Sequence, residues 1–365
     1  MRIGFVVNPV AGMGGAVGLK GTDGPQILRE AIARGAQKVA PARATAALTE
    51  IKKRRLEIEF LTASGEMGED ELRASGLDLR VVASADSTTG PDDTVRAVRA
   101  FLAEGVDLIL FAGGDGTARD ILGAGDGTVP MLGIPAGVKM HSSVFAVSPE
   151  KVADAVARFS ETGRVTDAEV MDVDEEAYRS GVLKARLFGV VKVPDDSNSI
   201  QETKDAYHTP DAEEEAEDIA RYIAETMDED TSYVLGPGTT TAAIARYLGI
   251  EKTVLGVDII RAGKLAAKDL TERGLSELVT KGRTKIVVSP IGAQGFIFGR
   301  GNQQISPRII RMVGVANVMV IATPTKLRGT PVLRVDTGDP ALDRDFSGRM
   351  KVIVGYGRRR LVSVK

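Results

Sequence analysis

The sequence predicts an α/β fold, with an open parallel sheet in the N-terminal part and a second, more β-rich domain after it. Three observations lead to this prediction. Short apolar runs alternate with helical stretches over the first third of the chain, which is typical of a parallel sheet with helices on both faces. Around Arg164 the pattern changes to short alternating runs that indicate antiparallel strands. The length of 365 residues suits two domains, which we place at 1–160 and 161–365, with the C-terminal segment able to pack back on the first.

The elements of the first domain follow from apolar periodicity and from helix-end signals. Asp92-Asp93-Thr94 offer N-cap residues, Val95, Val98 and Phe101 recur at helical spacing, and Gly105 suits a C-terminal cap. A further helix is expected to begin near Ala118, just after Thr117. The sequence predicts strands at 3–7, 56–61, 79–83 and 106–112, and helices at 25–36, 43–53 and 92–105.

The second domain is expected to open with two antiparallel strands, over 164–178 and 180–193. The polar segment 194–210 lacks periodicity and predicts an exposed loop. The charged helix after it, 211–227, carries an acidic run that we interpret as a solvated face. We expect further strands at 233–235, 254–260, 286–289 and 318–322, and helices at 242–248 and 307–313.

Composition excludes several classes of function. The 47 basic and 50 acidic residues nearly balance, so neither nucleic acid nor a membrane is expected as the main partner. The absence of cysteine excludes disulfides, thiolate nucleophiles and cysteine-based metal sites, and two histidines are too few for a His-rich metal site. No apolar run approaches the ~18 residues of a membrane helix, which leads us to expect a soluble cytoplasmic protein.

The strongest motif is the segment Gly113-Gly114-Asp115-Gly116-Thr117, which lies between a predicted strand and a predicted helix. Ligands bind at the carboxyl ends of strands in open α/β sheets. Gly113, Gly114 and Gly116 allow the backbone to approach a ligand and to direct N–H groups at anionic oxygens, and the helix adds its positive end. The segment therefore predicts a phosphate-binding loop.

Asp115 is unexpected in such a loop, because a carboxylate repels phosphate. Its presence is explained if it has a role in the reaction. It could accept the proton of an attacking hydroxyl, or hold a magnesium ion that bridges phosphates. The alternative is a plain turn, since Gly-Asp-Gly is common in turns. We favour a catalytic role, because strand, loop and helix follow one another in the expected order.

Two further glycine segments could contact phosphate or nucleotide. Asn8, Gly12 and Gly14 follow the first strand, but Val17 stands where a Rossmann fingerprint needs glycine. The second segment has Gly238, Thr239, Thr240 and Thr241 at a predicted helix start, which suits ribose or phosphate contacts or, equally, a well-capped helix.

No Walker A loop occurs, because Gly263-Lys264 lacks both the earlier glycine and the following Ser/Thr. The missing patterns argue against an ordinary NAD-dependent dehydrogenase and against a P-loop kinase. Downstream of the main loop, Lys139 could neutralise phosphate charge. His141 could contact a base or ribose, although a lone histidine is more often structural.

Taken together, Asn8-Pro9, Gly113–Thr117 and Gly238–Thr240 resemble the superfamily of NAD kinases, diacylglycerol kinases and phosphofructokinases. The longer segments 113–120, 133–142 and 236–241 are most similar to the ATP-NAD kinase family, in the branch that includes AcoX-like proteins. The resemblance implies a two-domain NAD kinase-like fold with its site in a cleft, a homo-oligomer formed through the second domain, and a threonine-rich loop that helps bind the nucleotide.

The resemblance also implies a reaction. Asp115 would match the family aspartate that activates the 2′-hydroxyl of the adenosine ribose of NAD. The glycines beside it would bind the phosphoryl donor, ATP or polyphosphate, with Mg²⁺ or another divalent cation. The chain lacks a convincing equivalent of the Asn-Glu pair with which better-known NAD kinases hold adenine and ribose. A kinase of another hydroxyl (a sugar, a lipid head group or an acetoin-related metabolite) and a non-catalytic nucleotide-binding regulator therefore remain alternatives.

Overall fold

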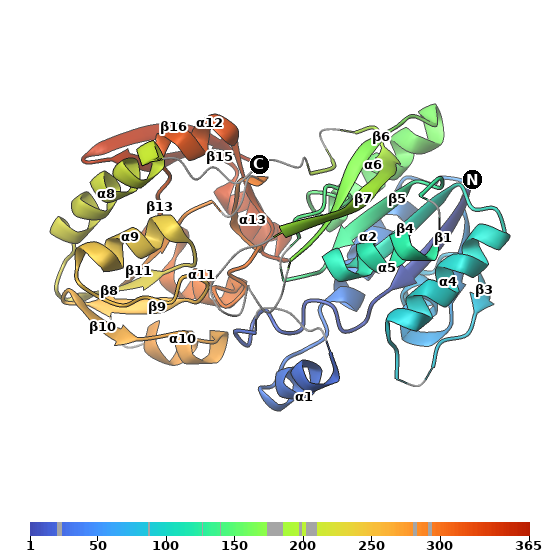
Figure 1. Cartoon of the computed structure of the whole chain (residues 1–365), viewed down its shortest axis with the longest axis horizontal. Coiled ribbons are helices and arrows are strands. Elements are labelled where there is room, and N and C mark those ends of the chain that lie inside the picture. Colours follow the sequence, from blue (N-terminus) through green and yellow to red (C-terminus); the bar gives the residue numbers. More distant parts are fainter. Residues whose placement is uncertain are drawn as a thin grey trace. The chain divides into compact units, whose positions relative to one another are not determined.

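The computed structural model describes residues 1–19, 24–86, 88–125, 127–138, 140–173, 185–196, 199–201, 210–279, 283–290 and 294–365. The chain divides into two compact units (Figure 1). The first unit comprises Met1–Gly14 and Lys20–Thr203, and the second comprises Gly15–Leu19 and Lys204–Lys365.

The first unit is built on a sheet of five parallel strands in the order β3-β2-β1-β4-β5. The strands of this unit are β1 (Arg2–Val7), β2 (Glu59–Ala63), β3 (Leu79–Ala83), β4 (Leu108–Gly113), β5 (Met131–Pro135), β6 (Val165–Val173) and β7 (Ala185–Pro194). Its helices are α1 (Pro25–Ala33), α2 (Ala40–Lys53), α3 (Glu69–Ser75), α4 (Pro91–Ala103), α5 (Asp115–Ala124), α6 (Pro149–Thr162) and the short 3-10 helix η1 (Gly65–Met67).

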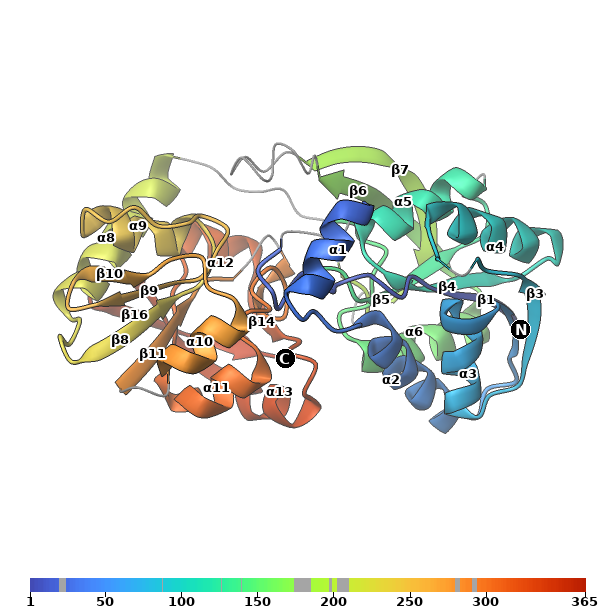
Figure 2. The same cartoon turned by 90° about the horizontal axis from the view of Figure 1, so that it is seen from below.

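Helices cover both faces of this sheet. Helix α2 packs on β1, β4 and β5 and contacts α3 and α6, whereas α4 packs on β1, β2 and β3 and contacts α5. Figure 2 shows α2, α3 and α6 on one side of the strands and α4 and α5 on the other. The strand order reverses between β1 and β4, and this is the point at which open α/β sheets bind ligands.

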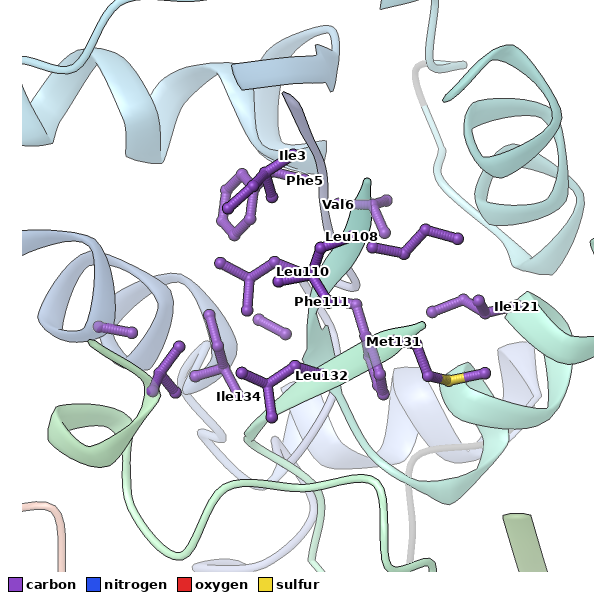
Figure 3. Close-up of a cluster of buried hydrophobic side chains, with 14 of the residues drawn as sticks. Ile3, Phe5, Val6, Leu108, Leu110, Phe111, Ile121, Met131, Leu132 and Ile134 are labelled. Carbon is purple, nitrogen blue, oxygen red and sulfur yellow. The ribbon is translucent and has the colours of Figure 1, made fainter. Parts of the chain in front are cut away.

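The central strands are buried on both faces, which explains their continuous apolar sequences. Figure 3 shows side chains from β1, β4 and β5, such as Phe5, Leu110 and Leu132, packed in one cluster with Ile121 of α5. Close packing depends on a glycine in β1. A Cβ atom at Gly4 would lie 2.5 Å from the Phe101 ring, so the missing side chain is what lets this ring of α4 rest on the strand.

The antiparallel strands β6 and β7 form a two-stranded ribbon beside the sheet. Helix α5 contacts β6, and β5 contacts β7. The segment after β5 is bound to this ribbon, because Ser143 donates its backbone N–H to Glu169 O at 2.9 Å and its hydroxyl accepts from Glu169 N at 2.8 Å.

Within the described residues, the second unit has more strands than the first. They form a five-stranded sheet of order β10-β9-β8-β11-β13 and a four-stranded sheet of order β12-β14-β16-β15. Strands β8, β11 and β13 are parallel, while β9 and β10 are antiparallel to their neighbours. The strands are β8 (Thr231–Leu235), β9 (Asp258–Arg261), β10 (Lys264–Ala267), β11 (Arg283–Val288), β12 (Phe296–Phe298), β13 (Val318–Val320), β14 (Val332–Val335), β15 (Gly348–Gly355) and β16 (Arg358–Val364). The helices are α8 (Pro210–Glu225), α9 (Thr239–Tyr247), α10 (Glu272–Val279), α11 (Pro307–Val313), α12 (Pro324–Gly329), α13 (Pro340–Phe346) and the 3-10 helix η3 (Val315–Asn317).

The predicted fold class is confirmed: a parallel five-stranded sheet precedes a more strand-rich region. Three local predictions were wrong. Helix α4 begins at Pro91 and is capped by Gly90, whose N–H donates to Asp93, so Asp92–Thr94 already lie in its first turn. Helix α5 begins at Asp115 and not near Ala118. The described part of segment 194–210 is not an exposed loop, because Asp196, Ser199 and Gln201 are buried.

No helix within the described ranges is both long and apolar enough to cross a membrane.

Candidate functional site

Three loops converge at the carboxyl edge of the five-stranded sheet in the first unit. They follow β1, β4 and β5, which are neighbours in the sheet and run parallel. Asn8 N donates to Ala112 O at 2.9 Å, which holds the β1 loop at the end of β4. The carbonyl oxygen of Gly113 accepts from Ala136 N and Gly137 N, each at 3.0 Å, which joins the β4 loop to the β5 loop. The sheet therefore brings together the first two predicted phosphate segments and the segment that follows β5.

Gly113 and Gly114 precede α5, and neighbouring atoms lie where their side chains would be. A Cβ atom at Gly113 would lie 2.4 Å from Thr117 Oγ1, and one at Gly114 would lie 3.1 Å from the Cα atom of Gly137. Gly114 is the N-cap residue of α5 and has extended backbone dihedrals. The first hydrogen bond within the helix runs from Ala118 N to Gly114 O at 3.1 Å, so the amides of Asp115, Gly116 and Thr117 form its first turn. Such a turn favours anions.

The β1 loop is fixed to α5 by side chains. Asn8 Nδ2 donates to Thr117 Oγ1 at 3.1 Å, and Asn8 Oδ1 accepts from Val10 N at 3.3 Å. Gly12 adopts a φ of 79°, and a Cβ atom there would lie 2.0 Å from Ala136 O. Only glycine suits this position, because the backbone is left-handed and a carbonyl lies against it. Gly14 lies in the same turn and is buried.

The carboxylate of Asp115 is held at the start of α5, where the helix dipole favours negative charge. Its residue is 6% exposed. Asp115 Oδ2 accepts from His141 N at 2.7 Å, and Asp115 Oδ1 accepts from Ser142 N at 3.0 Å and from Ser142 Oγ at 2.6 Å. These bonds orient the carboxylate and give it a structural part in joining α5 to the loop after β5.

Sequence reasoning missed Ser142 and Gln201. Ser142 is fully buried, and its hydroxyl also contacts the backbone of Met171 in β6, with O···O at 2.9 Å and N···O at 3.0 Å. Gln201 Nε2 donates to Ser142 O at 2.6 Å, although the two residues are far apart in sequence. Ser142 lies within segment 133–142, and the resemblance of this segment to a known family could have drawn attention to it. Nothing in the sequence signalled Gln201.

Three predicted site residues remain: His141, Gly116 and Lys139. His141 is half-buried, and the contact that reaches Asp115 comes from its backbone. Gly116 is a half-buried residue of the first turn of α5. Lys139 lies outside the described residues, as does His208. A side-chain role for His141 toward a base or ribose stays a prediction.

In the second unit, the predicted Gly/Thr loop connects β8 to α9. Gly238 is the N-cap residue of α9, with a φ of 117° and no side-chain cap. The hydroxyl of Thr241 lies 2.7 Å from Gly236 O and 2.9 Å from Gly238 O, and Gly238 N donates to Val254 O at 2.7 Å. Thr241 is thus a structural member of the loop, whereas Thr239 is exposed.

A lysine that sequence reasoning did not single out reaches the same loop. Lys326 of α12 donates from Nζ to Ser289 Oγ at 3.0 Å, Pro290 O at 3.1 Å and Thr240 Oγ1 at 3.3 Å. Burial lowers the pKa of Lys326 to about 8, because the charged ammonium is removed from water. The strands β8 and β11 end at this cluster, so it lies at the carboxyl edge of the second unit's parallel strands.

Two models of one protein family match the chain. The ATP-NAD kinase N-terminal domain matches residues 3–165, and the ATP-NAD kinase C-terminal domain matches residues 228–364. The chain belongs to the ATP-NAD kinase family. These matches support a kinase-type phosphotransferase that phosphorylates the hydroxyl of a small molecule, with ATP as donor. They do not separate the branches of the family, so the AcoX-like branch stays a prediction.

Solved structures add only distant likenesses. The chain is similar to an NAD kinase from Archaeoglobus fulgidus in complex with ATP, at 14% identity over 48% of this chain and 43% of that chain, with a TM-score of 0.19. It is also similar to a conserved domain protein from Vibrio cholerae, at 11% identity over 90% of this chain and 76% of that one, with a TM-score of 0.24. Both TM-scores are too low to bear on function. No curated protein sequence matches the chain.

Proposed function

We propose that this chain is a magnesium-dependent kinase that transfers a phosphoryl group from ATP to the 2′-hydroxyl of NAD. Both family matches support this proposal. The observation that carries it is the placement of Asp115, at the N-terminus of α5, where the loops after β1, β4 and β5 meet. The glycine backbone there suits a phosphate chain, and the carboxylate beside it suits a hydroxyl that must lose its proton.

In this proposal Asp115 accepts the proton of the 2′-hydroxyl as that oxygen forms a bond to the terminal phosphorus of ATP. The bond from this phosphorus to the oxygen that bridges to the β-phosphate breaks, and ADP leaves. The three hydrogen bonds from His141 and Ser142 hold the carboxylate in one orientation. The amides of the first turn of α5, with Gly113 and Gly114 before them, face the phosphate oxygens. Positioning and charge stabilisation supply most of the rate, because phosphoryl transfer requires little covalent chemistry from the protein.

A magnesium ion fits this site if the nucleotide phosphates supply most of its ligands. Kinases bind Mg²⁺ through one or two carboxylates plus substrate phosphates. Within the described ranges there is no group of three or more His, Asp or Glu side chains able to hold a metal ion, and Asp115 is the carboxylate at the phosphate loop. When bound, the ion would supply positive charge that offsets the negative charge of the phosphates.

The test is an Asp115→Asn variant assayed for NADP formation from ATP and NAD. We expect it to fold and to lose activity by ~10²–10⁴-fold, because a general base contributes that much. Asp92→Asn is the matched control, since it removes an exposed aspartate from the first turn of α4 in the same unit. Near wild-type turnover by Asp115→Asn would refute the role of the carboxylate.

A panel of acceptors identifies the hydroxyl. Wild-type protein is incubated with labelled ATP and NAD, NADH, sugars, lipid head groups or acetoin-related metabolites. We expect NAD to be the best acceptor. Faster transfer to another hydroxyl would keep the phosphotransferase and refute NAD as substrate, and tight nucleotide binding with no transfer to any acceptor would favour a regulator.

A further inference from the structure

The four-stranded sheet of the second unit carries only positive charge. Its strands contain no acidic residue, whereas β14 has one arginine, β15 has an arginine and a lysine, and β16 has three arginines. Each of the other three sheets within the described residues includes an acidic side chain, for example Glu59, Asp167 and Asp258. The near balance of charge over the whole chain therefore hides a local excess of cations in this sheet.

The β15–β16 hairpin has one buried face and one exposed face, because side chains of a strand alternate between its two sides. Val352, Val362 and Val364 lie in the hydrophobic core. The residues of the opposite face pair across the hairpin, in the register Arg349–Ser363, Lys351–Leu361 and Ile353–Arg359. All of them except Ile353 are exposed. The basic face of the hairpin therefore consists of Arg349, Lys351, Arg359, Leu361 and Ser363.

Helix α8 covers this side of the hairpin near its turn (Figure 1). Ile353 belongs to a buried cluster that includes Ile219 and Ile223 of α8. Farther along β15 the face is open. Within the part of the chain that the structure describes, the side chains of Arg349 and Lys351 form no hydrogen bond or ion pair. Two neighbouring cations are therefore exposed without a carboxylate from the protein itself.

An apolar side chain lies among these cations. Leu361 is 56% exposed, pairs with Lys351 across the hairpin and is two residues from Arg359 along β16. The interface of a lipid bilayer accommodates both kinds of group. Anionic headgroups attract the cations, and the boundary between headgroups and acyl chains accepts the leucine. The combination therefore matches a bilayer surface better than a purely ionic partner.

Nucleic acid is the other polyanion that could bind a basic surface, and the hairpin suits it less. Single strands bind where their bases stack on aromatic side chains. Tyr356 is the aromatic residue of this hairpin, and its ring centroid lies 4.8 Å from Cζ of Arg221 and 5.6 Å from the Tyr222 centroid. Its hydroxyl donates to Glu225 at 2.5 Å. The protein's own side chains therefore already use the ring on which a base would stack.

We propose that the basic face binds the surface of membranes that contain anionic phospholipids. Arg349, Lys351 and Arg359 contact the headgroup phosphates, and Leu361 enters the boundary with the acyl chains. The attachment is reversible, because each basic residue near an anionic surface contributes only about fivefold in affinity, or about 1 kcal/mol. The inference is independent of the proposed function, since none of these residues belongs to the candidate site.

The test is co-sedimentation of the full chain with vesicles of phosphatidylcholine alone or of phosphatidylcholine mixed with phosphatidylglycerol. We expect binding to the mixed vesicles only. It should weaken as salt rises from about 0.01 M to about 0.1 M, because the screening length falls from about 30 Å to about 10 Å. A double variant with Arg349→Gln and Lys351→Gln should lower the partition coefficient by about 30-fold, since two fivefold contributions are lost.

Leu361→Ser tests the apolar contribution. We expect it to lower the partition coefficient by about 3–10-fold and to leave the salt dependence in place, because no charge is removed.

Matched controls lie in the β9–β10 hairpin of the same unit. Arg261 and Lys264 are exposed and pair across this hairpin, and Leu265 is 37% exposed. A double variant with Arg261→Gln and Lys264→Gln removes the same charge from another sheet, and Leu265→Ser removes a similar apolar group. Both should bind mixed vesicles within about twofold of wild type.

Three results would overturn the inference. One is wild-type protein that does not distinguish the mixed from the neutral vesicles. Another is an equal loss in the two double variants, which would indicate net charge and not the basic face. The third is an Arg349→Gln, Lys351→Gln variant that loses affinity for a duplex oligonucleotide but keeps its affinity for mixed vesicles, which would make this face a nucleic-acid surface. If a variant does not fold, the lipid selectivity and salt dependence of wild-type protein still decide the question.

Discussion

Ser142 gives two hydrogen bonds to one oxygen of Asp115, from its backbone N–H at 3.0 Å and from its hydroxyl at 2.6 Å. The same hydroxyl contacts Met171 of β6. The orientation of the candidate catalytic carboxylate therefore depends on a strand outside the five-stranded sheet. Substitutions that disturb this buried connection should lower activity by shifting the Asp115 carboxylate, without removing the carboxylate itself.

Ser142→Ala should lower both stability and turnover. The change removes the hydroxyl that accepts from the Met171 N–H and donates to Asp115 Oδ1, and an unsatisfied buried polar group costs about 1–3 kcal/mol. We expect a lower Tm and a fall in kcat that is smaller than that of Asp115→Asn. Thermal unfolding and steady-state kinetics would check this, and an unchanged Tm would contradict the buried network.

Gly12→Ala should be more damaging than glycine-to-alanine changes at similar backbone dihedrals. Gly12 combines a φ of 79° with an Ala136 carbonyl oxygen that would lie 2.0 Å from the new Cβ atom. Gly35 has a φ of 81° and no atom within 4 Å of its Cβ position, so Gly35→Ala measures the backbone strain alone. We expect Gly12→Ala to cost more than the ~1–3 kcal/mol of that strain and to raise the KM for ATP. Equal losses of Tm in the two variants would refute the close approach.

Glu71 of α3 should make the protein less stable as pH rises. The residue is 5% exposed, and burial raises its pKa from 4.5 to about 7, against the lowering effect of a hydrogen bond to its own backbone. Between these values the folded state binds the proton more tightly than the unfolded state does. The free energy of unfolding therefore falls as pH rises from about 4.5 to about 7, by at most about 3 kcal/mol.

Replacing this carboxyl tests whether the free energy of unfolding falls as pH rises. Glu71→Gln should be more stable than wild type at pH 8 and should approach wild-type stability near pH 5, as measured by denaturant unfolding at both pH values. Glu57→Gln, an exposed glutamate of the same unit, is the control. A Glu71→Gln variant that is less stable than wild type at pH 8 would contradict a buried, unsatisfied carboxylate.

The sequence predicted the sheet well because its central strands are buried on both faces, and a short continuous apolar run such as Leu108–Ala112 is typical of a strand buried in this way. The glycine-rich loop was placed correctly at the end of β4. The start of α5 was predicted too late, because glycines suggest a loop although Gly116 is in the first helical turn. At Gly116 the packing of the helix on the sheet outweighs the low preference of glycine for helix.

The parts of the site that the sequence did not reveal are long-range contacts. Ser142 is 27 residues from Asp115, and Lys326 is 86 residues from Thr240, so no periodicity relates them. The described part of segment 194–210 was expected to be exposed because it is polar. Gln201 is nevertheless buried there, and its Nε2 donates to the backbone carbonyl of Ser142, a contact between distant residues that polarity alone does not predict.

The contact between Gly113 and Thr117 restricts which sequences this loop accepts. A methyl group at position 113 would overlap both Oγ1 and Cβ of Thr117, at 2.4 and 2.6 Å, so alanine at 113 requires glycine at 117. That second change would also take away the hydroxyl that binds Asn8. Positions 113, 117 and 8 should therefore vary together or not at all among relatives that keep this loop.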